Sequence, residues 1–184
     1  MRKLGLGTAC LALACGLGLP GAHAADNPDA GIQHLRNIAG GATNQVATQM
    51  FASGVRKCAE RVDLISNFLT KGTQSSALLF VPEREPDNMM VSISAEVQAE
   101  GVPRAYASAT FSPNTAIGCG AIYETVQYWT ESCKDVAAKT FKGGRPGGPL
   151  GSEFSILTIG PWARVFLIRA TSTSCVTIKK EVLK

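Results

Sequence analysis

The spacing of the apolar residues changes once along this chain, near Gly72, and that change limits the possible folds more than any other feature. Before Gly72 the apolar side chains recur at the period of an amphipathic helix, and after it apolar and polar residues alternate as in half-exposed strands. A helical segment followed by a series of strands predicts an α+β domain in which the helix covers one face of a sheet.

The helical segment is predicted to run without interruption from about Asn44 to Thr70, with Gly72 placed to end it. Its apolar stripe repeats every seven residues in two interleaved series, and we expect the stripe to face the core. The same heptad spacing leaves open a homodimer formed through this long N-terminal helix. The two series are Phe51, Cys58 and Ile65, and Val55, Val62 and Leu69.

The remaining chain predicts a sheet of about six or seven strands and a second, short helix. The pattern Ser132-x-x-Asp135 resembles a capping box and begins the short helix, which reaches about Phe141. The Gly- and Pro-rich residues 142–149 then predict a loop. Because short turns join neighbouring strands, we expect antiparallel pairing. The strands are expected at residues 77–81, 91–97, 104–111, 117–129, 154–159, 164–170 and 174–183.

Residues 1–24 predict a secretory signal peptide rather than part of the fold. Arg2 and Lys3 precede an apolar stretch at residues 4–19. Ala22-His23-Ala24 then supplies the small-x-small pattern that signal peptidase cleaves. We therefore expect a periplasmic or secreted protein.

After the leader, residues 25–43 are interpreted as a flexible lead-in and residues 44–184 as a single domain. Lipid attachment at Cys15 is an alternative to simple cleavage. It is less favoured, because Ala12 stands where a larger aliphatic residue is usual in such a motif.

Four cysteines remain once the leader is removed, and an even number in an exported chain predicts two disulfides. Their spacing matches no zinc-binding pattern, and no metal or cofactor is predicted. A Cys119–Cys133 pair is disfavoured, because the strand between them would have to fold back sharply. We favour Cys58 paired with Cys119 or Cys133, and Cys175 with the other.

Charge and histidine content argue against several functions. Without the leader the chain carries 16 Lys and Arg against 14 Asp and Glu, a net charge of +2, so nucleic acid is not an expected partner. No later apolar run is long enough to form a transmembrane segment. His34 is then the single histidine and lies in the lead-in, so we predict no catalytic residues and no enzyme.

The strongest candidate for a binding site is the segment Gly160-Pro161-Trp162-Ala163-Arg164, which is expected at a solvent-facing hairpin tip. Trp and Arg are enriched at binding hot spots, so Trp162 and Arg164 are predicted to contact a protein partner. Arg145, in the Gly-rich loop, is the third predicted contact, because loops often carry function.

Together these features predict an exported, non-enzymatic protein that binds another macromolecule, such as an inhibitor, an immunity-type protein or an envelope-assembly factor. One alternative is a periplasmic carrier of a small apolar ligand, held between helix and sheet where the strand residues are small. A less favoured alternative is a carboxylate-dependent hydrolase of cell-wall or polysaccharide material that uses Glu124. The small residues are Ala95, Ala105, Ala107 and Ala109.

Overall fold

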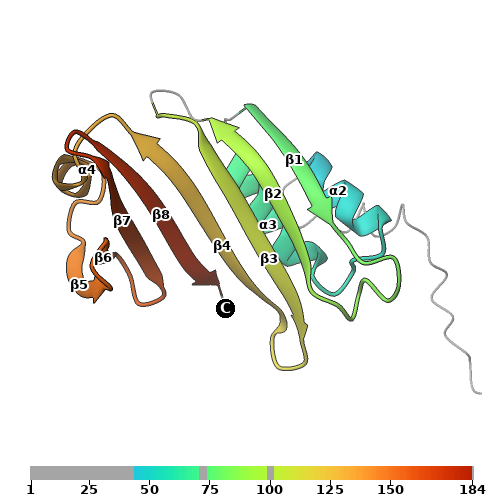
Figure 1. Ribbon diagram of the computed structural model, residues 1–184. Helices are drawn as coiled ribbons and strands as arrows, with labels where there is room; N and C mark the ends of the chain where they lie inside the picture. Colours follow the sequence, from blue (N-terminus) through green and yellow to red (C-terminus); the bar gives the residue numbers. More distant parts are fainter. Residues whose placement is uncertain (1–43, 71–73, 99–101, 184) are drawn as a thin grey trace, which may run out of the picture.

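The computed structural model describes residues 44–70, 74–98 and 102–183 (Figure 1). The predicted signal peptide, the lead-in and Gly72 lie outside these residues. Within them, three short helices and eight strands follow one another. They are α2 (Gln45–Ala52), α3 (Ala59–Thr70), β1 (Gln74–Phe80), β2 (Val91–Gln98), β3 (Ala105–Asn114), β4 (Gly118–Trp129), α4 (Cys133–Lys139), β5 (Arg145–Leu150), β6 (Phe154–Thr158), β7 (Ala163–Thr171) and β8 (Ser174–Leu183).

All eight strands form one sheet in the order β1-β2-β3-β4-β8-β7-β6-β5, and every neighbouring pair is antiparallel. The predicted antiparallel pairing is confirmed. The predicted α+β architecture, with one long helix on six or seven strands, is wrong: the described chain is mostly sheet, and its helices have 8, 12 and 7 residues. β4 and β8 meet at the centre of the sheet (Figure 1).

The predicted long helix is interrupted because Gly54 ends α2. Gly54 has a φ of 91°, a left-handed conformation that favours glycine. Its N–H donates to the carbonyl oxygen of Phe51 at 3.0 Å, and the N–H of Val55 donates to the carbonyl oxygen of Met50 at 3.2 Å. These two bonds form a Schellman motif, and Met50 and Val55 are buried together in the core, as is usual for that motif.

The loop between β1 and β2 holds this helix break in place. The Asp87 carboxylate accepts hydrogen bonds from the N–H groups of Arg56 and Lys57, at 2.7 and 2.5 Å. A Cβ atom on Gly54 would lie 3.0 Å from Cγ of Pro86 in the same loop. The break is therefore fixed by a local signal, the glycine, and by a distant one, the carboxylate.

The apolar stripe faces the sheet despite the break. Its residues from Val55 onward pack in one core with the strands of the sheet. A homodimer through a long helix therefore has no basis in the described residues, since the stripe is already covered within the chain. The buried members of the stripe are Val55, Cys58, Val62, Ile65 and Leu69.

Polar side chains join α2 to α3. Asn44 caps α2 by accepting a hydrogen bond from the N–H of Ala47, and its Nδ2 donates to Oγ of Ser66 at 2.8 Å. Asp63 of α3 is buried, and its Oδ1 has no hydrogen-bond partner among the described residues. Burial raises the pKa of Asp63, and hydrogen bonds from the Asn44 backbone and the Asn67 side chain oppose this only in part.

Two disulfides fix the helices to the sheet. Cys58, at the start of α3, is bonded to Cys119 of β4, and Cys133 of α4 is bonded to Cys175 of β8. This is one of the two arrangements that the sequence left open. Disulfides are typical of compartments outside the cytoplasm, with which the structure is consistent. No helix in the described chain is long and apolar enough to cross a membrane.

Two hydrophobic cores lie on the same face of the sheet. The larger packs α2 and α3 against β2, β3 and β4, with Phe111 fully buried within it. The smaller packs α4 against β7 and β8, where Nε1 of Trp129 donates to Oγ1 of Thr177 at 2.9 Å. We call this face, which carries Ala107 and Tyr123, the helix face.

The opposite face, which carries Ser108 and Glu124, is called the open face. Figure 1 looks onto it: α2 and α3 lie behind β1, β2 and β3, and no described helix lies in front of the strands. Side chains on this face alternate with the buried ones along each strand, as the burial of β2 and β3 shows.

The segment predicted as a loop at residues 142–149 contains an additional strand, β5. It pairs with β6 at the edge of the sheet, where proline is tolerated, and its register shifts between Pro146 and Pro149. A Cβ atom on Gly147 would lie 2.9 Å from Cγ2 of Ile156, so glycine allows the two strands to approach. The loop prediction fails because an irregular edge strand needs no apolar alternation.

Candidate functional site

The helix face carries a polar cluster between the two cores, where β4 pairs with β8. The hydroxyl of Tyr123 donates to Oε2 of Glu181, directly opposite, at 2.5 Å. Nζ of Lys179 donates to the Tyr123 hydroxyl at 2.5 Å and lies 3.1 Å from Oε2 of Glu181. Each of the three side chains in this polar cluster is thus bonded to the other two.

The cluster holds a fixed protonation state. Burial raises the pKa of Tyr123, and the hydrogen bond to Glu181 and the charge of that carboxylate raise it further, so the hydroxyl stays protonated at neutral pH. Burial alone would raise the pKa of Glu181, but hydrogen bonds from Tyr123 and Lys179 and the Lys179 charge outweigh it and lower the pKa. The arrangement suits holding a geometry rather than moving a proton.

Apolar side chains of α3 border the polar cluster on the β4 side. Phe68 is 61% exposed and Leu64 is 59% exposed. The rings of Phe68 and Tyr123 meet edge to face with their centroids 5.4 Å apart. Nζ of Lys179 lies 5.9 Å from the Phe68 centroid and 5.0 Å from the Tyr123 centroid, within the range of cation–π contacts. Phe68 therefore faces solvent beside a positive charge held in place.

The β6–β7 hairpin borders the cluster on the β7 side. Trp162 is 52% exposed, and its carbonyl oxygen accepts a hydrogen bond from the N–H of Val182 at 3.1 Å. Trp162 lines a hollow of about 340 Å³ together with Lys179 and Glu181 of the polar cluster. We refer to the assembled surface as the aromatic patch, which consists of Phe68, Tyr123, Trp162, Lys179 and Glu181.

The other two predicted contact residues lie away from this patch. Nη1 of Arg164 donates to the carbonyl oxygens of Gly160 and Ala163, both at 2.9 Å, and so braces the hairpin. Arg145 is exposed, on a strand rather than a loop. The register of β5, β6 and β7 places Arg145 and Arg164 on the open face. Of the three predicted contacts, only Trp162 lies in the aromatic patch.

Sequence reasoning missed most of the aromatic patch. Phe68 lies outside the predicted apolar stripe, and an apolar residue on the polar side of an amphipathic helix is the one sign that the sequence offers. Tyr123 and Glu181 are 58 residues apart, and only the β4–β8 register brings them together.

Carboxylate chemistry at Glu124 has no facing acid among the described residues. The neighbours of Glu124 across the strands are Ser108 and Lys180. Ser108 donates to its Oε1 at 3.3 Å, and Nζ of Lys180 lies 3.4 Å from its Oε2. Glu96 instead forms an ion pair with Arg104 at 2.7 Å.

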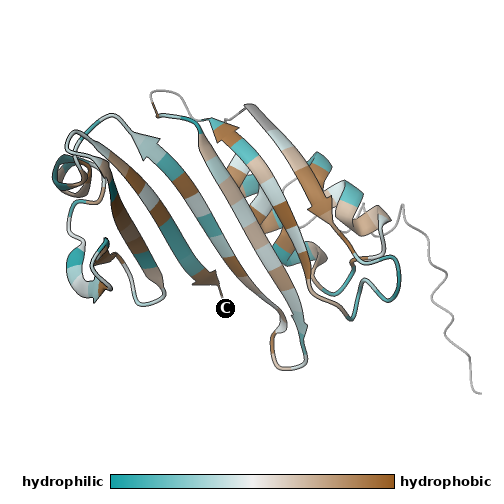
Figure 2. Cartoon of the chain, viewed as in Figure 1, coloured by the Kyte–Doolittle hydropathy of each residue, from teal (hydrophilic) through white to brown (hydrophobic). Residues whose placement is uncertain are grey.

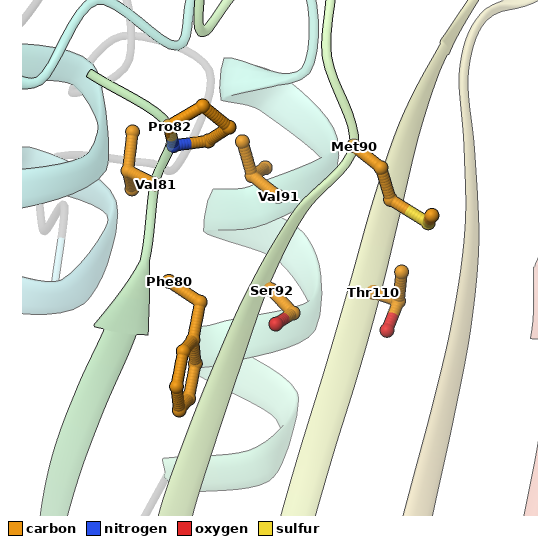
Figure 3. Close-up of a pocket in the computed structure, with 7 residues that line it drawn as sticks. All are labelled: Phe80, Val81, Pro82, Met90, Val91, Ser92 and Thr110. Carbon is orange, nitrogen blue, oxygen red and sulfur yellow. The ribbon is translucent and has the colours of Figure 1, made fainter.

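The small strand residues do not line the space that a carrier would need between helix and sheet. Ala95, Ala107 and Ala109 are buried, and the last two pack in one core with Val62 and Ile65 of α3. An open hollow of about 520 Å³ lies elsewhere, at the end of β1 and β2 where their loop leaves the sheet (Figure 3). It is lined by Phe80, Val81, Pro82, Met90, Val91, Ser92 and Thr110.

Among the described residues, no three His, Cys, Asp or Glu side chains gather where they could hold a metal ion. Comparisons of the chain with protein-family models, with curated proteins and with solved structures return no match. The functional argument therefore depends on the geometry of the surface.

Proposed function

We propose that this chain is an exported, non-enzymatic protein that binds a protein partner through the aromatic patch. The observation that carries the proposal is Phe68, 61% exposed, whose ring meets Tyr123 in a polar cluster whose members bond to one another. Trp162, 52% exposed, lines a hollow with Lys179 and Glu181 of the same cluster. Aromatic side chains on a rigid base lose little conformational entropy on binding, and they dominate interface energies.

The chemistry of the patch favours a protein partner of a particular kind. Lys179 offers a positive charge between two aromatic rings, while Glu181 and Tyr123 keep that charge in place. A complementary surface would present an apolar side chain to Phe68 or Trp162 and a carboxylate or carbonyl oxygen to Lys179. Such an interface would suit an inhibitor, an immunity-type protein or an envelope-assembly factor in the periplasm or outside the cell.

The proposal is tested by site-specific photo-crosslinking in the exporting cell. Benzoylphenylalanine replaces Trp162 in one variant and Tyr128 in a matched control, because Tyr128 is 53% exposed and lies on the open face. We expect one dominant crosslinked protein from position 162 and none of that species from position 128. Adding Phe68→Ala to the first variant should reduce the yield severalfold, since Phe68 is on the same patch.

Equal crosslinking from both positions, or a yield that Phe68→Ala leaves unchanged, would contradict the proposal. Far-UV circular dichroism of each variant separates loss of binding from loss of fold. Because Trp162 and Tyr128 are both more than half exposed, placing the crosslinker at either position removes no core contact.

A second candidate function, a carrier of a small apolar ligand, rests on the hollow in Figure 3. Its volume of about 520 Å³ lies within the range of small-molecule sites, and Phe80, Val81, Met90 and Val91 give it apolar walls. Native mass spectrometry of protein purified from the exporting host should then show a bound small molecule that Met90→Asp removes. A single mass equal to the polypeptide alone would count against a carrier.

A further inference from the structure

Two rows of apolar side chains cross the open face in register. In an antiparallel sheet, residues directly opposite each other on neighbouring strands point to the same face, so each row is fixed by the strand pairing. The outer row consists of Leu150, Phe154, Ile168, Val176 and Tyr128, and the inner row consists of Ile156, Phe166, Ile178, Val126 and Tyr106.

These rows form a continuous apolar surface. Five strands at about 4.8 Å spacing make each row roughly 19 Å long, and the rows lie about 7 Å apart along the strands. Leu150 and Tyr128, at the two ends of the outer row, are each 53% exposed. No described helix packs on this face. A surface of this kind on a water-exposed sheet indicates a binding function.

A row of charged residues runs beside the inner apolar row. It contains Arg145 on β5, Arg164 on β7 and Lys180 on β8, with Glu124 on β4 as the one acid. We call it the basic row. It lies one step of two residues, or about 7 Å, further along each strand. Figure 2 shows β8 as a teal segment between brown ones, with brown again at the C-terminal end of the strand.

Positive charge is also concentrated in the part of the chain that carries the apolar rows. Residues 115–184, which include β4 to β8, carry nine Lys and Arg against five Asp and Glu, a net charge of +4. Residues 44–114 carry six against seven, a net charge of −1. The apolar rows lie mainly on the positive part of the chain, so the field around them favours an anionic partner.

We propose that the open face binds the surface of an anionic phospholipid bilayer. The outer and inner apolar rows would enter the interface, and the basic row would lie at the level of the phosphate groups. Arg145 and Arg164 supply most of the attraction to negative lipid, because Lys180 pairs with Glu124 at 3.4 Å.

The shape of the face favours a bilayer over a single bound amphiphile. A small ligand needs a concave site that covers most of its surface, whereas each of these rows crosses five strands on the face of an eight-stranded sheet. Contact through the open face leaves Phe68 and the polar cluster on the opposite, helix face, whereas Trp162 lies opposite Val182 at the end of β8. The inference therefore goes beyond the proposed partner binding and stands without it.

The test is flotation with vesicles. Oxidised protein, recovered from an exporting host and checked by mass spectrometry, is mixed with vesicles of phosphatidylcholine alone or with 30% phosphatidylglycerol. We expect binding to the anionic vesicles only, and weaker binding as the salt concentration rises. Tyr128→Ser with Leu150→Ser, and separately Arg145→Glu, should each reduce the partition coefficient on the order of tenfold.

Matched controls keep the test specific. Leu78→Ser alters the far end of the open face, where Leu78 on β1 is also exposed, and Arg84→Glu makes the same charge change in the negative part of the chain. Both should bind vesicles as the parent protein does. Equal losses in these controls, or equal binding to neutral vesicles, would overturn the proposal.

The last part of the test is the oligomeric state of the protein in solution. If sedimentation shows a dimer that Tyr128→Ser with Leu150→Ser dissociates, and the parent protein does not float with anionic vesicles, the face is covered by a second copy and the proposal is overturned. Because flotation needs no protein partner, failure of the crosslinking test would leave this result unaffected.

Discussion

The two hydrophobic cores of this sheet are built in the same way but differ in size. The core beneath α2 and α3 contains 15 buried residues, and the core beneath α4 contains 5. Each has one disulfide that joins a helix to a strand. A helix of seven residues is not stable alone, and a small core adds little to hold it. The comparison indicates that the α4 half depends on its covalent bond more than the α2–α3 half does.

Removing either disulfide should have the largest effect on stability, and it tests directly whether the two halves differ. Cys133→Ser with Cys175→Ser should lower the free energy of unfolding by about 4 kcal/mol, as should Cys58→Ser with Cys119→Ser, because the loops span 42 and 61 residues. The local effects should differ: hydrogen exchange should show α4 unprotected in the first variant and α3 still protected in the second. Equal protection of both helices in both variants would refute the difference between the halves.

A milder change tests the polar contact in the smaller core. Trp129→Phe leaves the buried Thr177 hydroxyl without its donor and should cost about 1–3 kcal/mol in urea unfolding. Phe111→Leu in the larger core removes no hydrogen bond and should cost about 1 kcal/mol. If Phe111→Leu were the more costly of the two, the hydrogen bond would not be a main support of the α4 half.

The helix break in the larger half can be tested at Gly54. Gly54→Ala places a Cβ at a left-handed φ and 3.0 Å from Cγ of Pro86, and should cost about 1–2 kcal/mol. Gly118→Ala is the matched control, because Gly118 has a φ of 78° but no atom within 4 Å of its added Cβ. Thermal unfolding should show Gly54→Ala to be the more destabilising of the two. The reverse order would show that the contact with Pro86 adds nothing to the cost.

The smallest effects are expected from two carboxylates whose pKa values shift in opposite directions. Because the folded state raises the pKa of Asp63, it binds that proton more tightly, and the free energy of unfolding should fall as pH rises above about 3.9. Asp63→Asn should remove this loss. Because the folded state lowers the pKa of Glu181, its stabilising effect should disappear as pH falls through that lowered value. The free energy of unfolding, measured from pH 3 to 7, should therefore depend on pH differently in the two variants. Relative to the parent, Asp63→Asn should lose less stability as pH rises, and Glu181→Gln should lose less as pH falls.

The sequence predicts those parts of the fold whose signals are local. Ser132 caps α4 by accepting from the N–H of Asp135, as its spacing indicates. The seven expected strands all occur, because alternation survives where one face is buried. Gly54 was also a local signal, but the heptad spacing on both sides of it outweighed a single glycine. β5 could not be predicted, since its irregular pairing depends on Ile156 in the next strand.

The aromatic patch was predictable only at Trp162, whose turn sequence places it at a hairpin tip. The polar cluster depends on how β4 and β8 align, and nothing within either strand specifies that alignment. The two apolar rows of the open face are hidden in the sequence for the same reason. Each strand contributes only one or two members to them, and on β4, β7 and β8 those alternate with residues of the core.

The two edges of the sheet have unequal capacity to join another chain. β5 carries Pro146, Pro149 and a register shift, which prevent a further strand from adding there. β1 has neither proline nor charge along its length. Two copies that paired through β1 would leave only proline-blocked edges at both ends of the joined sheet. Growth by strand addition is therefore self-limiting at two chains, which protects an eight-stranded open sheet from forming fibres.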